Sequence, residues 1–184
     1  MEASGIHEGS YPVQFGWCGL DLEPSAILVK PEPEWTPSLF DPNAYEMHGI
    51  SYDAAHTLGE DAEVVAHKLN AALRGTAVVT DNQYWDGLWT ARLADSTGVP
   101  ILFGYNDSTN MASTFRDIYD PWCLDRRGSL FEAVDRFYPH THRADEDALR
   151  MATRTRMLID RDWSEWLLAR PAQQPVARRP FRLR

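Results

Sequence analysis

The sequence of residues 11–20, Tyr-Pro-Val-Gln-Phe-Gly-Trp-Cys-Gly-Leu, alternates between large apolar and smaller or polar side chains. Val13, Phe15 and Trp17 fall on one face of an extended chain, because successive side chains of a strand point to opposite sides. A turn-forming stretch follows, and Ala26–Val29 is a second strand candidate. The pattern therefore predicts a β-hairpin close to the N-terminus.

Short strands and helices alternate after this hairpin. Residues 30–42 contain four prolines, which predicts an irregular connection. Apolar spacing predicts helices at 61–73, 86–94, 130–137 and 144–168, and strands at 76–79 and 100–103. A hairpin followed by this alternation is typical of an α/β domain with a mixed sheet flanked by helices.

The length of 184 residues fits a single globular domain. We assign residues 1–169 to that domain. Residues 170–184 contain three prolines and five arginines with no acidic residue, so we expect them to form a disordered tail.

The net charge of −9 argues against a protein that coats duplex DNA, which needs many basic residues to neutralise phosphates. Carboxylates that hold divalent metals would themselves add negative charge. We find no apolar run that could span a bilayer and no export signal, so we expect a cytoplasmic protein without a membrane partner. Cys18 and Cys123 are expected to be free thiols.

Two acidic motifs stand at predicted helix starts. In His142-Arg-Ala-Asp-Glu-Asp147 a histidine on a loop precedes an aspartate in the first helical turn, a pairing that suits metal-assisted hydrolysis. In Asn82-Gln-Tyr-Trp-Asp86 an aspartate follows a predicted strand. Each has a plain structural alternative, because acids favour helix N-termini and Asp is a common N-cap residue.

These motifs, taken in order along the chain, resemble those of the DEDDh-type 3′–5′ exonucleases, the superfamily of ribonuclease T and the proofreading exonucleases. Asn82 to Asp86 resembles the family pattern Asn-x-x-Phe-Asp, and residues 46–51 resemble its His-Gly-Ile segment. The resemblance extends from Met1 to about Leu158. It implies a ribonuclease H-like mixed sheet flanked by helices.

The family also carries an Asp-x-Glu motif on its first strand. Asp21-Leu-Glu23 has the right letters, but it lies where the hairpin turn is expected, with no room for a further strand. Glu2-Ala-Ser-Gly5 resembles the end of the motif instead. In that register the first acid falls one position before Met1, and the first strand is missing or truncated, so we hypothesise that Met1 is a misassigned start or a truncation.

The resemblance implies two divalent cations, Mg²⁺ or Mn²⁺, and hydrolysis at the 3′ end of single-stranded RNA or DNA. The acidic ligands that it implies are Glu2, Asp86 and Asp147. His142 would be the general base. The substrate contacts that it implies are Ser4, Gly5, Tyr84 and Trp85.

Two alternatives stay open. One is a non-catalytic nucleic-acid-binding relative that keeps the fold without the activity. The other is an unrelated zinc hydrolase built on His140 and His142, because a His-x-His pair can bind zinc. Several members of the exonuclease family that this sequence resembles are dimers, so a homodimer is one expected assembly.

Overall fold

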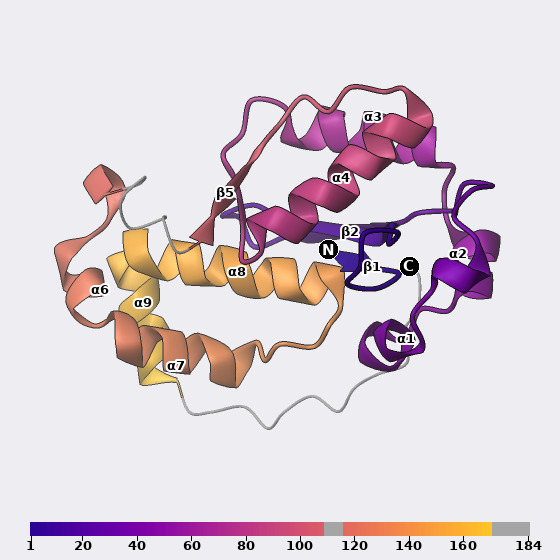
Figure 1. Cartoon of the computed structure of the whole chain (residues 1–184). Coiled ribbons are helices and arrows are strands. Elements are labelled where there is room, and N and C mark those ends of the chain that lie inside the picture. Colours follow the sequence, from indigo (N-terminus) through magenta and orange to yellow (C-terminus); the bar gives the residue numbers. More distant parts are fainter. Residues whose placement is uncertain (109–115, 171–184) are drawn as a thin grey trace. The chain divides into compact units, whose positions relative to one another are not determined.

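The computed structural model describes residues 1–108 and 116–170 (Figure 1). The chain forms two compact units. Unit 1 consists of residues Met1–Phe15 and Ala26–Met111, and unit 2 of residues Gly16–Ser25 and Ala112–Arg184.

The N-terminal sheet has three strands in the order β1-β2-β3. Their bounds are β1 Glu2–Ala3, β2 Pro12–Cys18 and β3 Pro24–Leu28. The predicted hairpin is therefore confirmed, although β3 begins before Ala26. Leu22 takes a left-handed φ of 65° in the connecting turn, and the amide of Glu23 donates to Asp21 Oδ1 at 3.2 Å.

Strand β2 lies between its two neighbours and is covered on both faces in its first half. Val13 and Phe15 are buried as the alternation predicts. Gln14, on the opposite face, is also buried, with 2% of its surface exposed. Strand β1 runs antiparallel to β2 and places Glu2 opposite Gln14.

Unit 1 continues with helices around a second, two-stranded sheet. Its further elements are η1 Pro37–Leu39, α1 Pro42–His48, α2 Tyr52–Leu58, α3 Ala62–Leu73, β4 Val78–Thr80, α4 Gln83–Thr97 and β5 Tyr105–Asp107. Strands β4 and β5 are parallel, with Val78 opposite Tyr105. The helix predicted at 61–73 is confirmed, and its apolar positions Val65 and Leu69 are fully buried.

The strand predicted at 100–103 is wrong, because the strand here is β5 at Tyr105–Asp107. A side chain of α3 takes up the backbone groups that a strand would need. The amide of Asn70 donates to the Pro100 carbonyl at 2.8 Å, and its oxygen accepts from the Leu102 amide at 2.8 Å. Residues 100–102 are thus held by a polar side chain and not by a neighbouring strand.

Unit 2 is a packed set of helices. Their bounds are η3 Arg116–Ile118, α6 Pro121–Asp125, α7 Arg127–Phe137, α8 Ala144–Ile159 and α9 Arg161–Ala169. Helices α6, α7, α8 and α9 share one apolar core (Figure 1), in which Cys123, Leu130, Val134, Met157 and Leu167 are buried.

The single helix predicted at 144–168 is divided into two. Asp160 breaks it, because its backbone is extended at φ −116° and ψ 93°. Its side chain accepts a hydrogen bond from the Trp163 amide at 3.0 Å. Asp160 is therefore the N-cap of α9, and an aspartate is favoured at such a position.

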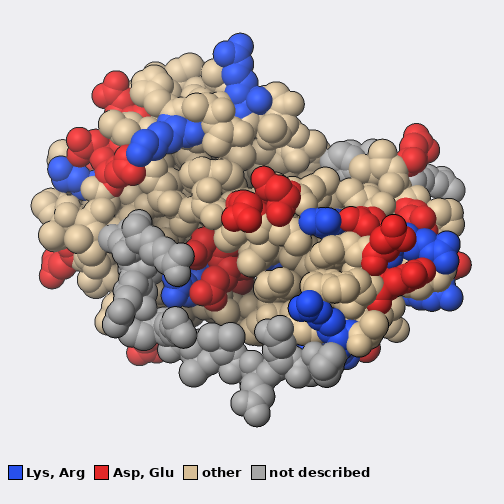
Figure 2. Space-filling view, turned by 180° about the vertical axis from the view of Figure 1, so that it is seen from behind, with Lys and Arg blue, Asp and Glu red and all other residues tan. Residues whose placement is uncertain are grey.

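The expectation of a disordered tail concerns residues that, from 171 on, lie outside the described part of the chain. Within the described residues, none of the helices has the length and apolar character that a membrane span requires. On the face shown in Figure 2, Lys and Arg side chains are intermixed with Asp and Glu side chains.

Gly16 of β2 lies against the first residue of α8. A Cβ at this position would stand 2.1 Å from the backbone carbonyl of Ala144, which is buried. A clash with backbone cannot be relieved by a side-chain rotation. We therefore expect Gly16→Ala to destabilise the chain by about 3 kcal/mol, measured by urea unfolding.

Gly128→Ala in α7 is the matched control, because a Cβ there meets no atom within 4 Å. We expect it to be neutral or to stabilise the chain by up to about 1 kcal/mol. Equal unfolding free energies for the two variants would show that Gly16 does not make the close contact.

Candidate functional site

Asp86 lies in the first turn of α4, directly after strand β4. The N-cap of this helix is Asn82, whose side chain accepts from the Trp85 amide at 3.4 Å. The structural alternative that made Asp86 itself the N-cap is therefore wrong. Asp86 is only 8% exposed, and its carboxylate accepts a hydrogen bond from the hydroxyl of Thr80 at the end of β4.

The surroundings of Asp86 disfavour its charged form. Burial raises the pKa of its carboxyl above the usual value, and the charge of Asp81 adds to this effect. The N-terminal ammonium and the hydrogen bond from Thr80 lower the pKa but do not offset burial. A neighbouring cation would stabilise the charged form of such a carboxylate.

Tyr105 of β5 shares these surroundings. Burial raises the pKa of its phenol, the charge of Asp86 raises it further, and a hydrogen bond with Thr90 lowers it. The two hydroxyl oxygens of Tyr105 and Thr90 are 2.9 Å apart. Tyr105 therefore stays protonated and can serve as a neutral hydrogen-bond donor beside the carboxylate.

Glu2 occupies strand β1 and is also only 8% exposed. Its neighbour Ala3 is fixed by His48, which ends α1. Nε2 of His48 lies 3.2 Å from the Ala3 carbonyl oxygen, and Nδ1 accepts from the Ile50 amide at 3.1 Å. The amide contact assigns the proton to Nε2, so the imidazole donates to Ala3. This gives the His-Gly-Ile segment a physical role, which is to hold β1 in place.

Ser4 and Gly5, the expected substrate contacts, continue from β1. Ser4 is fully buried, and its hydroxyl accepts from the Tyr11 amide at 3.0 Å. Its carbonyl accepts from the Asp41 amide at 2.7 Å. A Cβ at Gly5 would lie 2.9 Å from the ring of His7, so a larger residue here would require the His7 side chain to shift. Their roles toward a substrate stay a prediction.

Tyr84 and Trp85 form the outer end of an aromatic series. Tyr84 is 69% exposed and meets Trp85 edge-on, with ring centroids 5.2 Å apart. Trp85 stacks on Trp89 at 5.6 Å, and Trp89 donates to Ser10 Oγ at 2.8 Å. The inner end is thus anchored in the core, while the outer end offers rings on which a base could stack.

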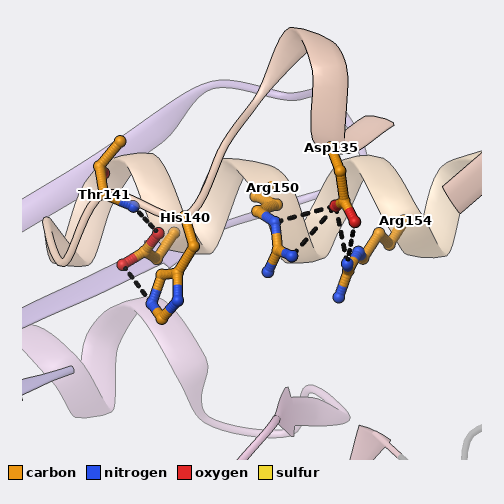
Figure 3. A network of polar contacts seen from close by, with 6 residues as sticks. Asp135, His140, Thr141, Arg150 and Arg154 are labelled. Carbon is orange, nitrogen blue, oxygen red and sulfur yellow. Dashed lines mark hydrogen bonds and ion pairs between the residues drawn. The ribbon is translucent and has the colours of Figure 1, made fainter. Parts of the chain in front are cut away.

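Asp147 lies in unit 2, in the first turn of α8, and its side chain is 19% exposed. Its Oδ1 accepts from the Thr141 amide at 3.1 Å, and its Oδ2 lies 3.1 Å from Nε2 of His140 (Figure 3). His142 is on the same loop, as predicted, with a left-handed φ of 54°. The rings of His140 and His142 are 4.2 Å apart.

The sequence reasoning missed three partners of the acidic residues, namely Thr80, His140 and Thr141. Thr80 ends a strand whose last residue was placed one position too early. His140 was considered only as half of a zinc pair. A histidine seven residues before an aspartate at a helix start was the available signal, because a loop of this length can fold back onto the first turn.

The expected site residues fall into both units. Glu2, Ser4, Gly5, Tyr84, Trp85 and Asp86 belong to unit 1, and His142 and Asp147 belong to unit 2. Across residues 1–108 and 116–170, no three His, Cys, Asp or Glu side chains converge into a group that could hold a metal ion.

The mixed α/β arrangement is a nuclease-like fold. It is similar to the crystal structure of Escherichia coli ExoI in its zinc-bound complex with single-stranded DNA, with a TM-score of 0.57 and 17% sequence identity over 90% of this chain. The chain spans 40% of the length of that structure. No protein-family model and no curated protein matches the sequence. The likeness establishes the fold.

Replacing Asp86 by asparagine should stabilise the chain at neutral pH. The pKa of Asp86 is raised in the folded chain. The stability of the parent chain is therefore greatest below the pKa of an unfolded aspartate, about 4, and it falls as pH rises through the pKa of the folded chain. An asparagine side chain avoids this loss and can still accept from Thr80. We expect Asp86→Asn to raise Tm by about 2–4 °C at pH 7, with the difference shrinking toward pH 4.

Asp95→Asn is the control for this comparison, because Asp95 is an exposed residue of the same helix α4. Its Tm should follow that of the parent chain within about 1 °C at each pH. A stabilisation by Asp86→Asn that is independent of pH would contradict the burial of an ionised carboxylate.

Replacing His48 by leucine should loosen strand β1. Leucine has a similar volume but leaves the Ala3 carbonyl and the Ile50 amide without their partner. We expect a loss of about 2–3 kcal/mol, measured by urea unfolding, because each buried polar group left unpaired is costly. His67→Leu, at a position whose side chain is 65% exposed, should change stability by less than about 0.5 kcal/mol. Similar losses in both variants would remove the special role of His48.

Proposed function

We propose that this chain is a metal-dependent 3′–5′ exonuclease domain that hydrolyses phosphodiester bonds at the 3′ end of single-stranded nucleic acid. The observation that carries the proposal is Asp86, a buried carboxylate of raised pKa at the junction of β4 and α4. It occurs in a fold similar to that of a protein solved with single-stranded DNA. A buried charge without full compensation is costly to keep unless a ligand uses it.

The acidic residues have the ligand chemistry that hard divalent cations prefer, although no three of them converge within residues 1–108 and 116–170. Asp86 and Glu2 are both nearly buried in unit 1, and carboxylate oxygens are the ligands that Mg²⁺ and Mn²⁺ prefer. We assign them, together with Asp147, as the metal-binding residues. Bound metal would supply charge stabilisation for the phosphate and a more acidic water.

The remaining roles belong to side chains and backbone of this chain. His142 accepts the proton of the attacking water, which suits an imidazole near neutral pH. Tyr84 and Trp85 stack on the terminal bases, and the backbone at Ser4 and Gly5 approaches the terminal nucleotide.

A non-catalytic nucleic-acid-binding relative is the second candidate. It is favoured by Asp147, whose two carboxylate oxygens are already engaged by Thr141 and His140. A carboxylate with both oxygens satisfied by the protein has less to gain from a cation than Asp86. This alternative predicts binding of a single strand without turnover.

The test is degradation of 5′-labelled and 3′-labelled single strands of DNA and RNA in Mn²⁺. The chain beginning at Met1 is compared with a version that carries an aspartate immediately before Met1. Progressive shortening of the 5′-labelled strand, with early release of the 3′ label, is the expected result for the active form. Asp86→Asn and Asp147→Asn should each lower kcat by at least about 100-fold, because each removes a proposed metal ligand.

Asp95→Asn is again the control and should retain full activity. Fluorescence anisotropy of a labelled strand in EDTA separates the two candidates. Binding without shortening in either form of the chain would support the non-catalytic relative and overturn the exonuclease proposal.

A further inference from the structure

We propose that Asp135 is a positioning residue that holds the Asp147 carboxylate in place, a role that rests on the proposed function. Asp135 lies on α7, close to its end at Phe137. By binding Arg150, the Asp135 carboxylate connects the two ends of the segment 135–150. This segment contains Asp147 and the two residues that contact its carboxylate, His140 and Thr141.

The closure consists of two arginines that share one carboxylate (Figure 3). Oδ1 of Asp135 accepts from Nε of Arg150 at 3.1 Å and from its Nη2 at 3.0 Å. Nη2 of Arg154 donates to both oxygens of Asp135, at 2.7 and 2.9 Å. Arg150 and Arg154 occupy successive turns of α8, so a single side chain of α7 is fixed at two points of the neighbouring helix.

The candidate site lies inside this closed segment. His140 and Thr141 belong to the loop that leaves α7, and Asp147 begins the helix that carries Arg150. Asp147 and Arg150 are three residues apart and therefore neighbours on one side of the helix surface. The contact between Asp135 and the arginines thus determines where the loop stands relative to the Asp147 carboxylate.

The loop needs such a constraint. His142 has a left-handed φ of 54°, an uncommon conformation that costs free energy for a residue with a side chain, although histidine adopts it more often than most residues. Asp135 and Arg150 are 15 residues apart in sequence, and the segment between them would otherwise sample many conformations. Closing the segment in advance removes that entropy, so the short contacts to Asp147 form at little further cost.

The two arginines are less exposed than the carboxylate that they share. Their side chains are 16% and 25% exposed, that of Asp135 is 44% exposed, and the guanidinium of Arg154 lies 5.2 Å from the ring centroid of Phe131. Two positive charges share one negative charge. Removing Asp135 would leave two like charges one helical turn apart, and their repulsion would move both side chains away from α7.

The Thr141 amide reports on this arrangement directly, because it donates to Asp147 Oδ1. Hydrogen exchange of that amide can be measured in the full chain without any substrate. We expect Asp135→Asn to speed its exchange by about tenfold, while the amide of Ser164 in α9 changes by less than about twofold. Asp135→Glu, which keeps the charge, should restore most of the protection.

Glu165→Gln is the matched control. It removes an ion pair with Arg161 of 2.9 Å in the same unit, but that pair spans four residues of one helix and closes no loop. Its Thr141 exchange should equal that of the parent chain. Arg154→Gln, which removes one of the two arginines and the repulsion between them, should give an intermediate increase.

Kinetics supply the second readout. If the active form shortens a 5′-labelled strand, Asp135→Asn should lower kcat by about tenfold and change KM by less than about twofold, because positioning acts on the chemical step. Faster Thr141 exchange in a chain without activity would support the positioning of Asp147 and reject the exonuclease function. Unchanged Thr141 exchange in Asp135→Asn, or an equal rise at Thr141 and Ser164, would overturn the proposal.

Discussion

The pairing of strand β2 with its neighbours is the constraint that orders the N-terminal sheet. β1 binds one edge of β2, and β3 binds the other. The Val29 amide donates to the Val13 carbonyl at 2.8 Å, which ties the connection after β3 to the same strand. Within β2, the residues up to Phe15 belong to unit 1, and the residues from Gly16 to Cys18 belong to unit 2. The residues along β2 therefore pack against different neighbours in the two units. At Gly16 there is no room for a side chain, because the backbone of Ala144 occupies the space where a Cβ would lie.

Much of the fold was predictable because its signals are local. The hairpin and the helices at 61–73 and 130–137 follow from apolar periodicity, and the buried positions Val13, Leu69 and Leu130 agree with it. The errors occurred where a polar side chain competes with the pattern. Asn70 binds the backbone of 100–102, and Asp160 starts a new helix inside a continuous apolar repeat. Periodicity describes burial, and it carries no information about which backbone groups a distant amide or carboxylate will bind.

The candidate site was predictable only in part, for a similar reason. The positions of Asp86 at a strand end and of His142 on a loop follow from local patterns. The burial of Asp86, the contact of His48 with Ala3 and the full engagement of Ser4 depend on residues that are distant in sequence. Motif letters identify which residues carry chemistry, whereas packing decides whether a given hydroxyl or carboxylate is open to a ligand.

The two aspartates differ in what the chain itself provides for them. Burial removes water from the Asp86 carboxylate and raises its pKa. The hydroxyl of Thr80 and the N-terminal ammonium lower this pKa, but they do not offset burial. Asp147 is more exposed and has a backbone amide and an imidazole on its two oxygens. A cation that bound Asp86 would stabilise a carboxylate that the chain leaves incompletely compensated. A cation that bound Asp147 would have to displace His140 or share the carboxylate with it. Under the proposed function, Asp86 would therefore gain more free energy from a bound cation than Asp147 would.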